Sequence, residues 1–262
     1  MGRPYDSIVD GGRTVTQELK HRVAIDDDES LDGPTLRAVP FEATSSPGET
    51  RLLSRRQRLQ LARIATRIRL PQRMVLYREE SIAHWVFFVA DGVMKSFHDL
   101  PSGKRRIMAF LFADDVFGLA QHGHYVNTLQ SVTPVTLYRI PLDVLTGTLR
   151  HDSDLQFQFI LKLTHELREM QLQKIVFARR DAEGRLAMFL RSLERHASNH
   201  TTHSHIEIPM SRSDMANYLG LSLEAVSRAS RKLELNGVLA FNDLHSVRVL
   251  NRSRFDKLAT AL

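Results

Sequence analysis

Two short helices joined by a glycine turn can be read between Ser211 and Gly237, and this pattern restricts the possible folds more than any other stretch of the 262 residues. Ser211 and its neighbours offer N-caps for a helix over residues 215–219, which Gly220 ends. Ser222 caps a second helix that continues to Gly237. Serine accepts a hydrogen bond from the first turn of a helix, and glycine adopts the left-handed conformation that follows the last turn. The segment therefore has the helix-turn-helix pattern.

The second of these helices leaves one polar face uncovered. The residues expected to pack the two helices together are Ala216, Leu219, Leu221, Val226 and Leu233. On the other side Glu224, Ser227 and Arg228 lie close in sequence at helical spacing, so their side chains emerge together near the helix N-terminus. Arginine can donate two hydrogen bonds to guanine, glutamate can accept one from the cytosine amino group, and serine can approach adenine or thymine. We therefore expect these three residues to read DNA bases.

Other residues near this face suit the DNA backbone, whose phosphates position a protein without selecting a sequence. The candidate phosphate contacts are Arg212, Ser213, Ser222, Arg231 and Lys232. Residues 238–250 are expected to form two short strands joined by a turn at 242–246, which is the wing of a winged helix. A simpler interpretation makes Glu224 and Arg228 an ordinary surface ion pair. The capped helices and the wing favour base reading over that interpretation.

The region from residue 71 to residue 140 has a different character from the C-terminal part. Short β-rich runs are separated by turn residues, as in the sequence letters VLY, HWVFFVA, GVMKSFHDL, RRIMAFLF, VFGLA and VTLYRI. Six to eight short strands in about seventy residues suit an antiparallel roll, because parallel strands would need crossover helices between them. Before this region, the apolar spacing over residues 51–69 predicts one amphipathic helix.

A long helix is expected after residue 152, because nearly thirty residues run without Gly or Pro. Its apolar residues recur at threes and fours: Leu155, Phe159, Leu163, Leu167, Met170 and Phe177. A seam of this length is usually buried against a second helix, and a second copy of the chain is the nearest partner. Packing on the chain's own β-domain is the alternative. Residues 182–197 predict a further amphipathic helix.

These patterns predict an α+β chain in four parts. Residues 1–48 are acidic and lack an apolar period, so we expect a disordered arm. A β-roll sensor or effector domain follows over 49–150, a dimerisation helix over 151–180, and a winged helix-turn-helix DNA-binding domain over 181–262. No apolar stretch approaches the roughly eighteen residues needed to cross a bilayer. We expect a cytoplasmic protein without a membrane partner.

Residues 208–239 strongly resemble the corresponding segment of CRP/FNR-type transcription regulators, and residues 70–119 resemble the β-roll of that family, a jelly roll like those that bind cyclic nucleotides. Glu224-x-x-Ser227-Arg228 is similar to the recognition signature of the FNR and FixK branches. The resemblance covers roughly residues 50–250. It implies a homodimer that binds an inverted repeat with TTGAT and ATCAA half-sites on double-stranded DNA, contacts RNA polymerase and mostly activates transcription.

The sensor region departs from the pattern of the resembled family. The chain has no cysteine, so a cysteine-bound iron–sulfur cluster is excluded. In the cyclic-nucleotide branch a Gly-Glu pair and an Arg-Ser pair surround the phosphate, whereas here Leu119 follows Gly118 and Asn127-Thr128 replaces Arg-Ser. Cyclic AMP is therefore not expected. Two interpretations stay open, a FixK-like protein without a cofactor and a haem-based sensor of NO, CO or O2. The candidate haem ligands are His84, His98, His122 and His124.

Other functions fit the sequence less well. His196, His200, His203 and His205 invite a metal site, but their Asn/Thr/Ser-rich surroundings indicate a solvated linker, so no metal is expected. No Gly-rich phosphate loop, HExxH or GxSxG motif occurs, so an enzyme is not expected. A regulatory ligand-binding protein built on the β-roll, without DNA binding, is the remaining alternative. Such a protein would not explain the polar face formed by Glu224, Ser227 and Arg228.

Overall fold

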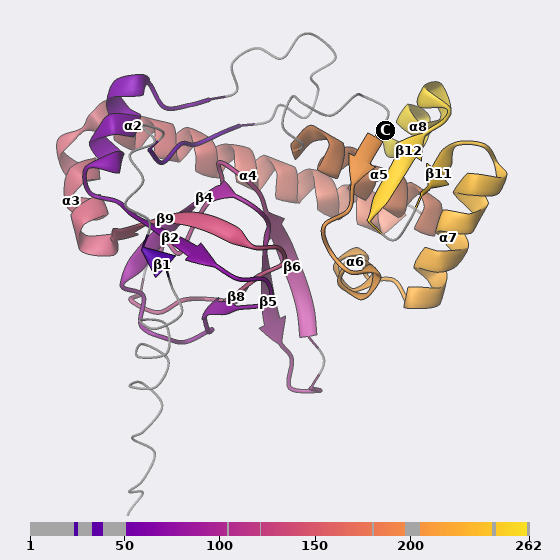
Figure 1. Cartoon of the computed structure of the whole chain (residues 1–262), viewed down its shortest axis with the longest axis horizontal. Helices are drawn as coiled ribbons and strands as arrows, with labels where there is room; N and C mark the ends of the chain where they lie inside the picture. The colour runs from indigo at the N-terminus through magenta and orange to yellow at the C-terminus, as the bar shows by residue number, and fades with distance from the viewer. Residues whose placement is uncertain are drawn as a thin grey trace, which may run out of the picture.

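The fold was obtained as a computed structural model of the whole chain. It describes residues 24–25, 33–38, 51–103, 105–120, 122–179, 181–196, 205–242 and 245–260. Figure 1 shows a β-domain, a long helix that runs past it, and a smaller C-terminal domain at the far end of that helix.

Two antiparallel sheets make up the β-domain. One sheet has the strand order β1-β2-β9-β4-β7 and the other has the order β3-β8-β5-β6. The strands are β1 Ala24–Ile25, β2 Thr66–Leu70, β3 Val75–Tyr77, β4 Trp85–Asp91, β5 Met94–Asp99, β6 Arg105–Leu111, β7 Val116–Phe117, β8 Thr128–Ser131 and β9 Val135–Pro141. All pairings are antiparallel, which confirms the predicted roll.

Strand β4 is buried on both faces, and this explains its continuous apolar sequence. Phe87 and Val89 point into the core between the two sheets, whereas Val86 and Phe88 belong to a second core on the outer face of the first sheet. Successive side chains of a strand alternate between faces, so a strand covered on both sides must be apolar throughout. Helices provide the outer cover.

Three helices supply that outer cover: α2 Arg55–Ala62, α3 Leu142–His151 and α4 Ser153–Arg179. Leu61, Leu145 and Leu155 are fully buried there, and the ring of Phe159 packs edge-on against Phe88 at 6.1 Å between centroids. The predicted long helix is therefore confirmed as α4. The sequence pattern did not indicate α3, whose N-cap Pro141 makes no side-chain cap.

The prediction of one helix over residues 51–69 is wrong in its second half. The helix ends at Ala62, and Thr66–Leu70 forms strand β2, paired with β9. Ile68 and Leu70 are buried while Arg69 between them is exposed. Alternation of this kind belongs to a strand, and it outweighs the coarse helical spacing of the arginine-rich segment.

The expectation of disorder for residues 1–48 differs from the structure at residues 24–25, which form β1, and at residues 33–38, while most of that range lies outside the described residues. Leu36 is fully buried in the core beneath α2, and its carbonyl accepts a hydrogen bond from Leu52 N–H at 2.8 Å. Gly33 is needed here, because a Cβ atom would lie 2.6 Å from both Ala62 Cβ and Arg58 O. A few apolar and small residues thus order this part of an otherwise acidic segment.

The C-terminal domain consists of helices around a small sheet of order β10-β12-β11. Its elements are α5 Ala182–His196, β10 His205–Glu207, α6 Arg212–Leu219, α7 Leu223–Leu235, β11 Leu239–Phe241, β12 Ser246–Val249 and α8 Arg252–Ala259. The two predicted wing strands are β11 and β12. The sequence pattern did not indicate β10 or α8.

The predicted α+β fold with a β-roll, a long helix and a winged helix-turn-helix is confirmed. We propose that the four parts of the chain are divided after residues 48, 150 and 180, as the sequence predicts. No helix among the described residues is long and apolar enough to span a membrane.

Candidate DNA-binding site

The turn between α6 and α7 is fixed by local hydrogen bonds. Ser211 Oγ accepts from Asp214 N–H at 3.0 Å, and Ser222 Oγ accepts from Ala225 N–H at 3.1 Å, so both predicted N-caps form. Gly220 has φ +64°, the left-handed conformation that a side chain would strain. Leu221 N–H then donates to Ala216 O at 2.9 Å and closes the turn.

The apolar residues predicted to join the two helices do so. Ala216, Leu219, Val226 and Leu233 are buried in one core, and Leu221 is partly buried against it. Because the buried side of α7 is occupied in this way, its opposite side must face solvent.

The predicted reading residues Glu224, Ser227 and Arg228 are all exposed on α7. No direct ion pair joins Glu224 to Arg228 among the described residues, although the charge of Arg228 acts on the Glu224 carboxylate. The pKa of Glu224 is lowered mainly by its own backbone N–H, then by the Ser222 hydroxyl, and only to a smaller extent by Arg228. The first turn of the helix therefore stabilises the carboxylate, and the guanidinium of Arg228 stays open to solvent.

The predicted phosphate contacts do not all lie on this open side. Ser213 and Arg231 are exposed, and Arg212 is half-buried at the start of α6. The Ser222 hydroxyl caps α7, and Lys232 forms an ion pair with Glu183 of α5. Arg231 is therefore the better phosphate candidate on α7.

The wing adds a cation that the sequence interpretation did not single out. Arg248 is exposed on β12, between the buried Val247 and the half-buried Val249. The alternation of apolar and charged residues in the letters VRV could have predicted that Arg248 is exposed on a strand.

The seam predicted on α4 divides into two groups. Leu155 and Phe159 lie in the chain's own core, so the prediction that they face a second copy is wrong for this structure. Leu163, Leu167 and Met170 are 51, 57 and 53 % exposed, and Ile160, which was not singled out, is 51 % exposed. The Phe177 side chain lies outside the described residues.

Three of the four candidate haem ligands lie on two neighbouring turns, since Ala83 N–H donates to Gly123 O at 2.8 Å and Ile82 bridges to His124. His84, His122 and His124 are exposed, and His98 Nδ1 lies 2.8 Å from Glu79 Oε1. Among the described residues, no group of three His, Cys, Asp or Glu side chains could hold a metal ion. His196 ends α5 and His205 begins β10, so the prediction that these two histidines lie in a solvated linker is wrong. His200 and His203 lie outside the described residues.

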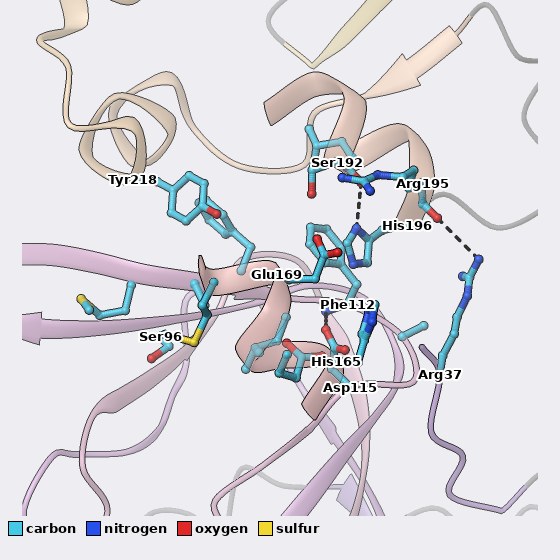
Figure 2. Close-up of a pocket in the computed structure, with 18 of the residues that line it drawn as sticks. Arg37, Ser96, Phe112, Asp115, His165, Glu169, Ser192, Arg195, His196 and Tyr218 are labelled. Carbon is cyan, nitrogen blue, oxygen red and sulfur yellow. Dashed lines mark hydrogen bonds between the residues drawn. The ribbon is translucent and has the colours of Figure 1, made fainter. Parts of the chain in front are cut away.

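A cavity of about 360 Å³ lies where β6, α4 and α5 meet, shown in Figure 2. His196 forms part of its wall, with its ring stacked on Phe112 at 4.4 Å between centroids and its Nδ1 2.7 Å from Ser192 O. Arg37 Nη2 donates to Arg195 O at 3.5 Å (Figure 2). The cavity thus lies between the β-domain and the first helix of the C-terminal domain.

Comparison with known proteins agrees with this geometry. Residues 184–258 match the model of the Crp-like helix-turn-helix domain, and residues 67–152 match that of the cyclic nucleotide-binding domain. The transcriptional activatory protein AadR of Rhodopseudomonas palustris is 31% identical over 204 residues, which cover 76% of this chain and 83% of the relative. The chain belongs to the CRP/FNR family of transcription regulators.

Other relatives of this CRP/FNR regulator fall in the FixK branch. The nitrogen fixation regulation protein FixK of Bradyrhizobium diazoefficiens is 29% identical over 188 residues, covering 71% of this chain and 78% of the relative. The solved structure of FixK2 from Bradyrhizobium japonicum superposes with a TM-score of 0.70 at 28% identity, covering 76% of this chain and 99% of that one. This CRP/FNR regulator is a DNA-binding protein and not an enzyme.

Proposed function

We propose that this regulator binds, as a homodimer, an inverted repeat with TTGAT and ATCAA half-sites, and that it activates transcription through contact with RNA polymerase. The observation that carries the proposal is the exposed group of Glu224, Ser227 and Arg228 at the capped N-terminus of α7. The N-terminal part of the second helix is the part that enters the major groove in helix-turn-helix proteins.

The dimer is supported by the exposed apolar residues of α4. Ile160, Leu163, Leu167 and Met170 follow the three-and-four spacing of a coiled-coil seam. A row of half-exposed apolar side chains of this length is unusual on a monomer, and a symmetric second copy would bury it. The same symmetry would present two α7 helices to the two halves of an inverted repeat.

We further propose that the β-roll works without a cyclic nucleotide. Tyr77 and Tyr125 stack in the core between the sheets at 3.6 Å between centroids, and Phe87 and Phe117 stack beside them at 5.3 Å. Asn127 lies 3.5 Å from the Tyr77 hydroxyl and provides no cation for a phosphate. Addition of cyclic AMP should leave DNA binding unchanged, whereas a cyclic-AMP-dependent gain would refute this part of the proposal.

Because the relatives that match are transcription regulators, and DNA binding requires access to the chromosome, we propose a cytoplasmic location. Activation can be tested by transcription in vitro with purified RNA polymerase and a template that carries the inverted repeat. The proposal predicts more transcript when the regulator is added. An unchanged or smaller amount of transcript would argue for repression or for no polymerase contact.

The DNA site is best tested by selecting bound sequences from random DNA, with and without added haem and with and without a reductant. We expect an inverted repeat of TTGAT type in all four samples. Enrichment only with haem, accompanied by absorbance near about 400 nm, would instead support the haem-sensing alternative. Failure to enrich any inverted repeat would contradict the proposal.

A further inference from the structure

The first helix of the helix-turn-helix is fastened to the free edge of the β-roll by one side-chain amide. Asn217 Oδ1 accepts from Ile107 N–H at 2.7 Å, and Asn217 Nδ2 donates to Arg105 O at 2.5 Å. Among the described residues, strand β6 is the last strand of its sheet, so no described strand pairs with its outer backbone groups. The amide of Asn217 supplies the acceptor and donor that another strand would supply.

A charged contact lies on the same side of α6, one turn before Asn217. Lys95 Nζ donates to both carboxylate oxygens of Asp214, at 2.8 and 2.9 Å. The two side chains are only 12 and 23 % exposed, so solvent screens this pair less than an ordinary surface pair.

Aromatic packing completes the joint between the domains. Phe110 of β6 meets Tyr218 of α6 edge-on at 5.3 Å and lies 5.9 Å from Phe189 of α5, measured between ring centroids. Phe97 and Ile107, on the outer face of the β-roll, share one continuous core with the buried residues of the C-terminal domain. Figure 1 shows α6 beside β6, with α7 on the far side of the domain.

This joint covers α6 and leaves the reading face of α7 exposed. The docked arrangement therefore does not obstruct Glu224, Ser227 or Arg228. In a dimer it would also fix how far apart the two α7 helices lie, because each would be tied to a β-roll that is packed on α4. The two halves of an inverted repeat are read only at a set separation along the DNA.

We infer that Asn217 is a positioning residue, which holds the DNA-reading helices in the DNA-competent arrangement by fastening α6 to strand β6. The inference rests on the proposed function, because it assumes a dimer that reads an inverted repeat. Weakening the contact between α6 and β6 lowers the fraction of dimers in which both α7 helices have the correct separation. The affinity for the complete repeat falls with that fraction. Binding to an isolated half-site needs no set spacing and should change little.

The test compares full-length wild-type protein with Asn217→Ala on inverted repeats of varied spacer length and on an isolated half-site. Removal of two hydrogen bonds should weaken binding to the best-spaced repeat about tenfold, flatten the preference among spacers, and leave half-site affinity unchanged. Asp99→Ala is the matched control, because it removes the ion pair with Arg105 on the same hairpin without touching α6. It should behave like the wild type.

A cross-link separates positioning from a general loss of folding. The chain has no cysteine, so Lys95→Cys with Asp214→Cys gives one unique pair for a short bis-maleimide. The cross-linked protein should bind the repeat as the wild type does, and it should restore affinity and spacer preference to Asn217→Ala. A merely local role of Asn217 in folding α6 would not be rescued by the cross-link.

Three results would overturn the inference: an unchanged spacer preference in Asn217→Ala, tighter binding by that variant, or loss of binding on cross-linking. The last two would mean that the docked arrangement inhibits DNA binding. If the wild type itself shows no preference for an inverted repeat, the proposed function fails instead, so the two failures are distinguishable.

Discussion

The ammonium nitrogen of Lys162 lies 2.7 Å from Asp115 Oδ1, in a position where the lysine side chain is only 3 % exposed. The same nitrogen lies 2.7 Å from Glu166 Oε1 and donates to Arg37 O at 2.8 Å. Burial alone would lower the pKa of Lys162, but the charges of Asp115 and Glu166 outweigh burial and raise it. One buried cation thus joins α4, the turn before β7 and the segment 33–38.

Replacement of Lys162 by Met should therefore destabilise the protein, because Asp115 would stay buried without its cation. Removal of one partner of a buried ion pair typically costs about 3–5 kcal/mol. Urea unfolding should show this loss, whereas Arg168→Met, an exposed cation on the same helix, should cost less than about 0.5 kcal/mol. Equal stability of the two variants would mean that Lys162 contributes no more than a surface charge.

Lowering the pH should reduce the free energy of unfolding, because His196 is protonated more readily in the unfolded chain. Burial is the main cause that lowers the pKa of His196; Arg195 and Lys162 lower it further, while Asp115 and the hydrogen bond to Ser192 O raise it. Below about pH 6.5 this histidine is protonated in the unfolded chain but stays neutral in the folded chain, because its pKa is lower in the folded state. The free energy of unfolding should therefore fall as the pH is lowered from about 7.5 to 5.5.

The measurement compares urea unfolding of wild type and His196→Phe across that range. Phenylalanine keeps the stacking on Phe112 but cannot titrate, so the fall should be smaller in the variant. The pKa of His165 is also lowered, mainly by burial, and this larger, burial-derived part stays in both proteins, while His196 contributes only the smallest of the causes. Parallel stability curves for the two proteins would show that His196 does not titrate differently on folding.

A charge in the exposed seam of α4 should separate the dimer. Leu163→Glu would bury a carboxylate in each copy of a symmetric interface, at a cost on the order of 3 kcal/mol each. Sedimentation should then report a monomer, and binding to the inverted repeat should be lost. Leu161→Glu is the control, since Leu161 is also exposed but lies nearly opposite Leu163 around the helix. A monomer from both variants, or from neither, would argue against the seam.

The reading helix could be predicted because its signals are local. Ser211, Gly220 and Ser222 mark the helix ends, and the spacing of Glu224 and Arg228 places both on one face. The roll was equally predictable from turn residues and apolar runs. In contrast, α3 has Gly147 in its interior and no capping side chain, so its local signals are weaker than those of the reading helix.

What the sequence could not provide depends on long-range contacts. Helix α4 carries apolar residues on two sides, and only the fold decides that Phe159 packs on Phe88 while Leu163 stays exposed. Lys162 is polar in sequence and yet buried, because Asp115 reaches it from a distant turn. The bond between Asn217 and Ile107 joins residues 110 positions apart, which no periodicity reveals.

The most direct test of the account compares the affinities of wild type, Arg228→Ala and Arg231→Ala for the selected inverted repeat, its single-base variants and random DNA over a range of salt. Arg228→Ala should lose about 1–3 kcal/mol on the repeat and the preference at one base pair, with little change on random DNA. Arg231→Ala should weaken all DNA similarly and lower the salt slope by about one. Equal losses from both variants on specific and random DNA would contradict the claim that Arg228 reads bases.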